Sequence, residues 1–383
     1  MTLLVMPTLN CNLRCAYCSW RYKGYEPVEY QEDPEKMALW AVKVAQETGH
    51  REVVLHGGEP LLWPIQKLEK FMETATRFGY RIGVQTNATL ITNKHIELFK
   101  RYNVGVGVSI DGDPEIGTSR GFWRPDGESL FDHDVNKYVV RRVMTNLEKM
   151  AKAGVQIGVI IVLSKINASP EKVEKLAGFI KWLKSIGVAN GRLNPAFNSP
   201  YELSWKELVD TYKELYYKIR DLGVFYTPYA DFAKGLMGNR DVTCWYAGCG
   251  FWDTHVWTVL PNGKLTACDR VMWLGMYPLR EVRNTLTAIQ ARTYALLQTE
   301  LRNSLNGHLH RGGCPVESPD GDWRRASRFW RAWDELFEWY AEELKAVAPH
   351  LVLTNRYPDK LEYVQKIDSG CMWDLYNGGF RCP

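Results

Sequence analysis

Three cysteines crowd one short stretch near the N-terminus. Cys11, Cys15 and Cys18 follow one another at spacings of four and three residues, in the sequence Cys-Asn-Leu-Arg-Cys-Ala-Tyr-Cys. Thiolates are soft ligands that suit zinc, copper(I) or an iron-sulfur cluster, and three of them on one loop can wrap a cluster while leaving its fourth corner open. Chance places this spacing in such a chain only about once in two hundred times. The stretch therefore predicts a metal centre.

This spacing resembles the signature loop of the radical SAM enzymes. The resemblance implies that the three cysteines hold a [4Fe-4S] cluster and that S-adenosylmethionine (SAM) binds its fourth iron. Tyr17 stands just before the third cysteine, where that family usually has an aromatic residue near the adenine of SAM. The competing interpretation is a structural zinc site, which normally brings a fourth Cys or His within a few residues. The next histidine here is His50, so the cluster is favoured.

The whole chain limits the class of protein. A length of 383 residues with 45% hydrophobic content predicts two globular domains. A formal charge of +4 is too small to indicate a nucleic-acid or membrane surface as partner. The N-terminus lacks the features of a signal peptide, and no long apolar run follows. An odd number of cysteines at ligand-like spacings fits a reducing compartment, so we expect a cytoplasmic enzyme.

Short apolar runs alternate with amphipathic segments, a pattern typical of parallel strands joined by helices. Glycines or prolines bound several of the helical segments, and Ser204 with Glu207 forms a capping box before the last of them. The predicted strands are 3–8, 52–56, 81–85, 104–110, 157–163 and 191–195, with helices that include 34–48 and 170–186. We therefore predict an α/β fold: a partial (β/α)6 barrel, open like an incomplete TIM barrel, over residues 1–225.

Ligands of parallel α/β folds bind at the carboxyl ends of strands. The second strand is followed by Gly57, Gly58, Glu59 and Pro60, where glycines permit close approach of a ligand and the carboxylate could accept from an ammonium group. A plain turn is the alternative. The tetrapeptide is similar to the Gly-Gly-Glu-Pro element of radical SAM enzymes, and this resemblance implies that it binds the amino group of SAM.

Polar residues also follow the third and fourth strands. Gln85 and Asn87 resemble a strand end that related maturases turn toward the cofactor or substrate. Ser109 and Asp111 resemble a ribose-contacting strand end; they alternate to one face, although an Asp-Gly turn is the alternative. Arg120, followed by a Gly-x-Ser-Leu-Phe-Asp run with one inserted leucine, resembles the maturase arginine that contacts the carboxylate of SAM.

A second set of cysteines is scattered through the C-terminal half: Cys244, Cys249, Cys268 and Cys314. Residues 256–260 and 264–267 predict a hairpin that turns at Gly263. The pattern is similar to the SPASM and Twitch extensions of radical SAM enzymes, and it lacks the later Cys-x-x-Cys pair of a full SPASM domain. The resemblance implies a Twitch-like domain over residues 226–383 with one auxiliary [4Fe-4S] cluster. Cys314 is the expected fourth ligand, with His308 or His310 as alternatives if they are not solvent-facing.

The C-terminal tail carries two lone thiols, Cys371 and Cys382. Lone cysteines are more often inert apolar residues, but these two could donate a hydrogen atom to a substrate radical or act as ligands. Before them, an aromatic stripe at helical spacing is typical of core packing against the barrel. It comprises Phe329, Trp333, Phe337, Tyr340 and Leu344.

The family resemblance implies an enzyme that reductively cleaves SAM to a 5′-deoxyadenosyl radical, which abstracts a substrate hydrogen; the cofactors supply this chemistry. We expect a peptide or protein maturase, reduced by a partner such as ferredoxin or flavodoxin. The barrel begins at Leu3, without a preceding leader-binding domain, so a separate recognition protein or a small-molecule substrate is also considered. The alternatives are a radical dehydrogenase or epimerase acting on a sugar or aminocyclitol, and a non-catalytic zinc-binding protein.

Overall fold

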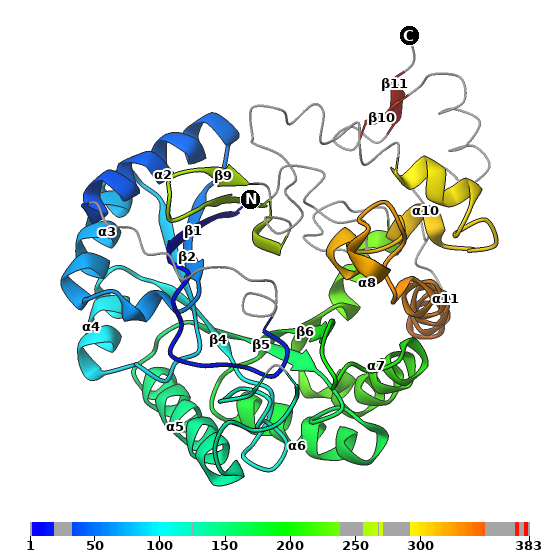
Figure 1. The fold of residues 1–383 in the computed structure, drawn as a ribbon, viewed down its shortest axis with the longest axis horizontal. Coiled ribbons are helices and arrows are strands. Elements are labelled where there is room, and N and C mark those ends of the chain that lie inside the picture. The colour runs from blue at the N-terminus through cyan, green and yellow to red at the C-terminus, as the bar shows by residue number, and fades with distance from the viewer. Residues whose placement is uncertain are drawn as a thin grey trace. The chain divides into compact units, whose positions relative to one another are not determined.

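The computed structural model describes residues 2–18, 33–124, 126–237, 256–266, 268–270, 292–348, 372–374 and 379–381. Their Cα positions divide the chain into two compact units (Figure 1). The first comprises Met1–Leu203, Asp210–Tyr226 and Trp257–Leu265, and the second comprises Ser204–Val209, Thr227–Val256 and Thr266–Pro383.

One nine-stranded sheet organises the first unit. In the order β7-β6-β5-β4-β3-β2-β1-β8-β9, the strands from β1 to β6 pair in parallel with their neighbours in sequence. Their bounds are β1 Thr2–Thr8, β2 Glu52–Gly57, β3 Arg81–Thr86, β4 Gly105–Ser109, β5 Ile157–Leu163, β6 Asn190–Pro195, β7 Phe225–Thr227, β8 Val256–Val259 and β9 Leu265–Thr266. The predicted α/β fold, with an open and largely parallel sheet, is confirmed.

Helices cover the outer face of this curved sheet (Figure 1). They are α2 Pro34–Thr48, α3 Ile65–Arg77, α4 Asn93–Arg101, α5 His133–Lys152 and α6 Val173–Ser185, and α7 Trp205–Ile219 follows the last strand of the parallel set. Alternate strand residues such as Val53, Leu55 and Val108 are fully buried, as expected for a face packed on helices. The opposite, concave face carries several glycines, including Gly83, Gly105 and Gly107.

Local signals fix the helix ends. Asp33 caps α2 by accepting from the backbone N–H of Glu35, and Gly49 ends it in a left-handed conformation. The predicted capping box before α7 is confirmed, because Ser204 and Glu207 bond each other's backbone N–H groups.

Two features differ from the prediction. Helix α4 was missed, because it is only nine residues long and its capping box uses His95 in place of the usual Glu or Gln. The hairpin of β8 and β9 was expected to form part of the C-terminal domain, yet it continues the barrel sheet beside β1. There it covers backbone groups that β1 would otherwise expose along the sheet edge.

The second unit is built around an aromatic helix pair. Phe232 on α8 (Tyr229–Leu236) packs edge-on against Phe337 on α11 (Trp330–Val347), and Tyr229 stacks on Tyr340. The predicted aromatic stripe therefore packs on α8. The remaining described elements are α10 Gly307–His310, η8 Pro315–Glu317, η9 Pro319–Gly321 and the antiparallel pair β10 Met372–Asp374 and β11 Gly379–Arg381.

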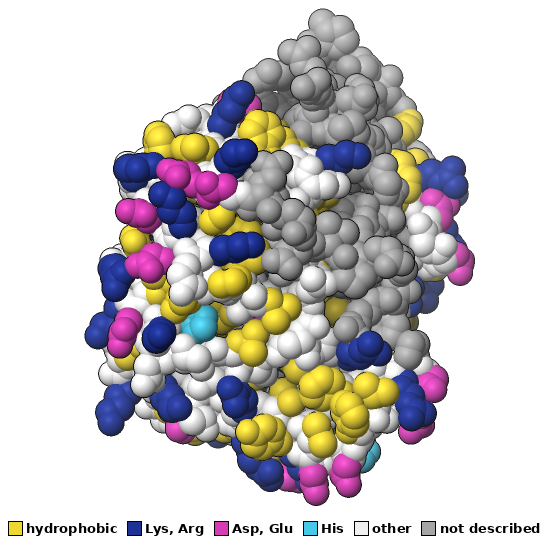
Figure 2. Space-filling model, turned by 60° about the vertical axis from the view of Figure 1, so that its left-hand side comes forward, with side chains coloured by type: hydrophobic (Ala, Val, Ile, Leu, Met, Phe, Trp, Pro, Cys, Tyr) yellow, Lys and Arg dark blue, Asp and Glu magenta, His cyan; other side chains and the backbone are white. Residues whose placement is uncertain are grey.

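Figure 2 shows one face of the molecule, where the described Lys and Arg side chains lie among acidic and hydrophobic ones. This interspersion agrees with the small formal charge of +4. Within the described residues, we find no helix with both the length and the apolar character needed to cross a bilayer.

Candidate functional site

The cysteine loop follows β1 and is held by backbone hydrogen bonds to residues 119–123. Arg14 donates to the carbonyl of Gly121 (2.7 Å) and accepts from Trp123 (2.9 Å). Ala16 donates to the carbonyl of Ser119 (2.9 Å). Cys15 therefore lies between two residues that are fixed to this neighbouring segment.

The three thiols lie close enough to influence one another. Burial raises the pKa of Cys11 to about 11 and also raises the pKa of Cys15, and the thiol of Cys18 adds to both increases. Buried thiols with raised pKa values are poor thiolates unless a positively charged centre stabilises the anion. The backbone N–H of Leu13 and the Asn87 amide point at Cys11 Sγ, at 3.4 and 3.8 Å.

This donor set fits an iron-sulfur cluster. In the parts of the chain that the structure describes, no three or more His, Cys, Asp or Glu side chains converge as ligands of one metal ion. In a zinc site each cysteine sulfur lies about 2.3 Å from the metal, so the sulfurs of one site must converge on a single point. Cysteine thiolates that hold a cluster are spread around it, and Cys11, Cys15 and Cys18 offer three partly exposed thiols on one loop.

Gly57 and Gly58 allow β2 to meet the cysteine loop. A Cβ on Gly58 would lie 2.0 Å from the carbonyl oxygen of Asn10, and one on Gly57 would lie 2.4 Å from that of Thr8. Gly58 and Glu59 donate their N–H groups to these same two carbonyls, at 2.9 and 2.7 Å. The close approach that these glycines permit is thus one between two segments of the protein itself.

Glu59 is buried and accepts three hydrogen bonds from the protein. The donors are the hydroxyl of Thr86 (2.7 Å) and the backbone N–H groups of Asn87 (2.7 Å) and Leu61 (3.0 Å), the last capping the turn that begins at Pro60. Burial raises the pKa of this carboxyl to about 7, against the opposing effect of these donors. A carboxylate offers about four acceptor positions, so one is left for a ligand.

The ends of β3 and β4 are linked on the concave side. Gln85 Nε2 donates to Ser109 Oγ at 2.8 Å. Asn87 donates to Asn12 in the cysteine loop (2.9 Å) and accepts from the hydroxyl of Thr89 (2.6 Å). Asn87 thereby joins the loop to the end of β3.

Asp111 is the centre of a buried hydrogen-bond network. One carboxylate oxygen accepts from Tyr17 Oη (2.5 Å) and Ser119 Oγ (2.7 Å). The other accepts from Arg120 Nε (3.0 Å) and the backbone N–H of Val162 in β5 (2.8 Å). These four donors fill the roughly four acceptor positions of the carboxylate. A direct contact with ribose would have to replace one of them.

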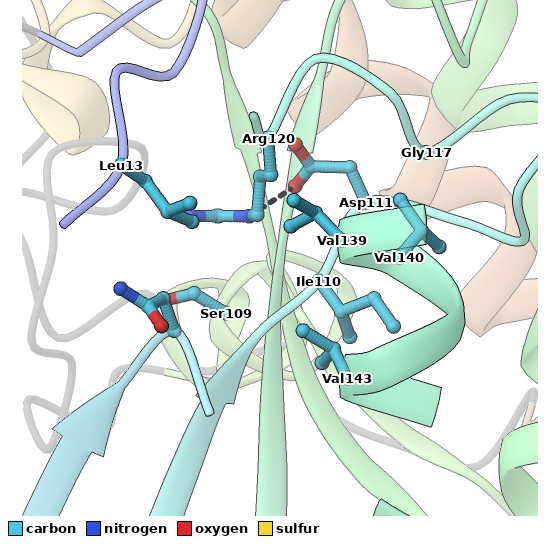
Figure 3. A pocket seen from close by; sticks show the side chains of 10 residues that line it. Leu13, Ser109, Ile110, Asp111, Gly117, Arg120, Val139, Val140 and Val143 are labelled. Atoms are coloured by element: carbon cyan, nitrogen blue, oxygen red, sulfur yellow. Dashed lines mark hydrogen bonds and ion pairs between the residues drawn. The ribbon is translucent and has the colours of Figure 1, made fainter. Parts of the chain in front are cut away.

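Arg120 and Tyr17 complete this network. The guanidinium carbon of Arg120 lies 5.4 Å from the centre of the Tyr17 ring, within cation-π range. Burial raises the pKa of Tyr17 well above its usual value, so its hydroxyl stays protonated and donates. Figure 3 shows Arg120 beside Asp111, with its guanidinium extending toward Leu13. The pocket there is lined by Leu13, Asn87, Ser109, Ile110, Asp111, Gly117, Arg120, Val139, Val140 and Val143.

The second cysteine set is described only in part. Cys244, Cys249, Cys371 and Cys382 lie outside the described residues. Cys268 Sγ lies 3.3 Å from Asp269 Oδ1. Cys314 is buried and follows three residues in the left-handed region, Arg311, Gly312 and Gly313.

The two histidines considered as alternative ligands, His308 and His310, are both buried, which excludes the competing interpretation that they are solvent-facing imidazoles. His310 Nδ1 accepts from the N–H of Gly312 (3.1 Å), and Nε2 faces Asp334 Oδ1 (3.4 Å). Both ring nitrogens are thus engaged, which removes His310 as a ready metal ligand. Burial lowers its pKa.

Sequence reasoning missed three residues that organise these loops. Ser119 and Thr89 bond the side chains of Asp111 and Asn87. In the second unit, Arg292 donates to backbone carbonyls that include those of Arg311 (3.0 Å) and Arg325 (2.8 Å). The contacts of Arg292 join residues 19 and 33 positions apart, whereas Thr89 and Ser119 lie two and eight residues from the side chains that they bond.

The open, largely parallel sheet with a three-thiol loop after its first strand is the arrangement that the sequence resemblance to radical SAM enzymes predicts. The model of the Radical SAM superfamily matches residues 5–180, so this part of the chain carries a radical SAM domain, and the cofactors of such domains are an iron-sulfur cluster and SAM.

Relatives extend this assignment. The chain is 25% identical over 299 residues to the Cysteine-type anaerobic sulfatase-maturating enzyme of Clostridium novyi, covering 70% of this chain and 73% of that one. It is 32% identical over 114 residues to an uncharacterized protein of Archaeoglobus fulgidus, where it spans 29% of its own length and only 25% of that relative. Among solved structures, anSMEcpe with bound AdoMet and Cp18Cys peptide shares the fold, with a TM-score of 0.69 at 20% identity over 91% of this chain and 99% of that chain.

Proposed function

We propose that this protein is a radical SAM maturase that modifies a peptide or protein. The observation that carries this proposal is the extent of the similarity to the Clostridium novyi enzyme. The alignment with that enzyme extends over 299 residues, which is longer than the matched radical SAM domain at residues 5–180. The similarity therefore continues beyond this domain into the C-terminal half. That relative is named for the maturation of sulfatases, and proteins of this kind are the substrate class that we carry over.

In this proposal Cys11, Cys15 and Cys18 hold the first cluster, whose open position takes SAM. When bound, the cluster and SAM supply a 5′-deoxyadenosyl radical that takes a hydrogen atom from the substrate. The chain's own part is to fix the loop. It does so through the backbone bonds of Arg14 and Ala16 and the side chain of Asn87.

The strand ends then orient SAM. Glu59 has one acceptor position left for the ammonium group, and Arg120 uses Nε for Asp111 while keeping further N–H donors for the carboxylate. Around them, Tyr17, Gln85 and Ser109 supply contacts to the nucleoside. Asp111 acts here by holding Tyr17 and Arg120 in place.

The C-terminal part, residues 226–383, is proposed to hold one auxiliary cluster on Cys244, Cys249, Cys268 and Cys314. Cys371 and Cys382 remain candidate hydrogen donors. A cytoplasmic ferredoxin or flavodoxin would supply the electron that SAM cleavage consumes.

The proposal is tested with anaerobically reconstituted protein. We expect about eight irons per chain, from two four-iron clusters, and release of 5′-deoxyadenosine under strong reductant. A Cys15→Ala control should release none. Incubation with sulfatase-derived peptides that present Cys or Ser at the modified position should produce a mass change. SAM cleavage without modification of any such peptide, together with turnover of a sugar or aminocyclitol, would overturn the maturase assignment.

A further inference from the structure

Arg120 and Asp111 form a largely buried ion pair inside the site. Arg120 Nε lies 3.0 Å from Asp111 Oδ1, and the exposed fractions of the two side chains are 13% and 0%. Surface ion pairs are weakened by water and salt. Here little solvent reaches either charge, so each acts on its surroundings over a longer range.

The group beside this pair is the middle cysteine of the loop. Arg14 and Ala16 flank Cys15, and they donate to the carbonyls of Gly121 and Ser119, which flank Arg120. The backbone ladder therefore sets Cys15 opposite Arg120. The guanidinium carbon of Arg120 lies 5.4 Å from the centre of the Tyr17 ring, and Asp111 accepts from Tyr17 Oη at 2.5 Å. The two opposite charges of the pair therefore both lie against the cysteine loop.

We propose that Asp111 keeps the reduction potential of the first cluster low by neutralising the charge of Arg120 beside Cys15. The inference rests on the proposed function, because it requires a cluster on Cys11, Cys15 and Cys18. Reduction adds one electron to the cluster, and an uncompensated cation nearby stabilises the more negative, reduced form. A low potential makes the reduced cluster a stronger electron donor to SAM. Asp111 is accordingly a positioning and charge-compensating residue.

The network around Asp111 allows its charge to be removed with little change of shape. In Asp111→Asn the amide can face Tyr17 and Ser119, whose hydroxyls can rotate to accept instead of donate. The remaining oxygen still accepts from Arg120 and Val162. The variant therefore leaves the cation of Arg120 in place without its counter-charge.

The experiment is a redox titration of the reconstituted protein without SAM, followed by the EPR signal of the reduced first cluster. The auxiliary cluster is removed with Cys314→Ala in every sample, so that one signal is followed. We expect Asp111→Asn to raise the midpoint potential and Arg120→Gln to lower it. The double variant should return close to the parent value, because both charges are then absent.

Two controls separate charge from damage to the fold. Arg120→Lys keeps the charge, so the midpoint potential should stay near that of the parent. Asp113→Asn removes a carboxylate from the same loop, where it accepts from the N–H groups of Glu115 and Ile116 at a partly exposed position. Solvent screens this charge, and little shift is expected.

The outcomes are distinct. Absence of iron, sulfide and the EPR signal in the parent protein would contradict the proposed function itself. If the cluster forms but Asp111→Asn and Arg120→Gln shift the potential in the same direction, or neither shifts it, the charge-compensation proposal is wrong. If Asp111→Asn fails to retain the cluster, the comparison of Arg120→Gln with Arg120→Lys still decides: equal potentials for these two variants overturn the proposal.

Discussion

The cysteine loop of the first unit and the Cys314 segment of the second each lie beside a buried arginine, but the two arginines bond differently. Arg120 pairs with the carboxylate of Asp111. Arg292, only 4% exposed, donates to the backbone carbonyls of Trp323 (2.7 Å), Arg311 (3.0 Å) and Arg325 (2.8 Å). The first arrangement fixes the charge beside a thiol, whereas the second fixes the path of a loop.

The loop before Cys314 needs such support because its backbone is unusual. Arg311, Gly312 and Gly313 have φ angles of 52°, 79° and 70°. A Cβ on Gly312 would lie 2.6 Å from Leu296, and one on Gly313 would lie 2.8 Å from Ser327, so both positions exclude a side chain. The cysteine loop, in contrast, is held by ordinary strand-like bonds to its neighbour.

Replacing a cysteine should have the largest effect on SAM cleavage in the loop of the first unit and little effect on it in the Cys314 segment of the second. Cys15→Ala should abolish release of 5′-deoxyadenosine, a loss beyond the roughly 100-fold that changes around metal ligands cause. Cys314→Ala should lose about four irons per chain and retain reductive cleavage of SAM. Iron analysis and chromatography of 5′-deoxyadenosine measure both. If Cys314→Ala also abolishes cleavage, the two regions are not independent.

Removal of Arg292 tests whether its role is structural. Arg292→Met removes the hydrogen bonds that Arg292 donates to these carbonyls, of which that of Arg325 still accepts from Ser318, and should destabilise the second unit by about 1–3 kcal/mol. Arg292→Lys should lose less, because its ammonium group keeps the charge and can still donate to some of the carbonyls, although it lacks the planar fork that reaches all of them. Thermal and denaturant unfolding measure this. Arg324→Met, at an exposed position bonded to Asp322, is the matched control and should change little.

The same contrast shows what the sequence can predict. Strands such as 157–163 and the helix 34–48 were predicted with their correct bounds, because their signals are local. The three-thiol loop is equally local. The bonding of Asp111 could not be foreseen, since its four donors come from three separated segments: Tyr17, the neighbours Ser119 and Arg120, and Val162. The role of Arg292 could not be predicted for the same reason, because its hydrogen bonds join distant segments.

The affinity for SAM should depend on pH through the ionisation of Glu59. Burial raises the pKa of Glu59 to about 7, so its ionised fraction rises about tenfold from pH 6 to pH 8. Because the ionised carboxylate attracts the ammonium group, the affinity for SAM should rise by a similar factor over this range. Calorimetric titration of the reconstituted protein measures it. Glu59→Gln should bind SAM more weakly and lack this rise, whereas a rise of equal size in that variant would assign it to another group.

The smallest effect concerns the cap of α5, which lies in the same unit as the cysteine loop without contacting its thiols. Asp132 accepts from the backbone N–H of Asp134 at 3.0 Å and so caps a helix whose Val139, Val140 and Val143 line the pocket. Asp132→Ala should cost about 1 kcal/mol of unfolding free energy, and Asp132→Asn much less, because asparagine caps as well as aspartate. Iron content should be unchanged in both variants. Loss of iron from Asp132→Ala alone would show that the cluster loop depends on helix packing as well as on its own hydrogen bonds.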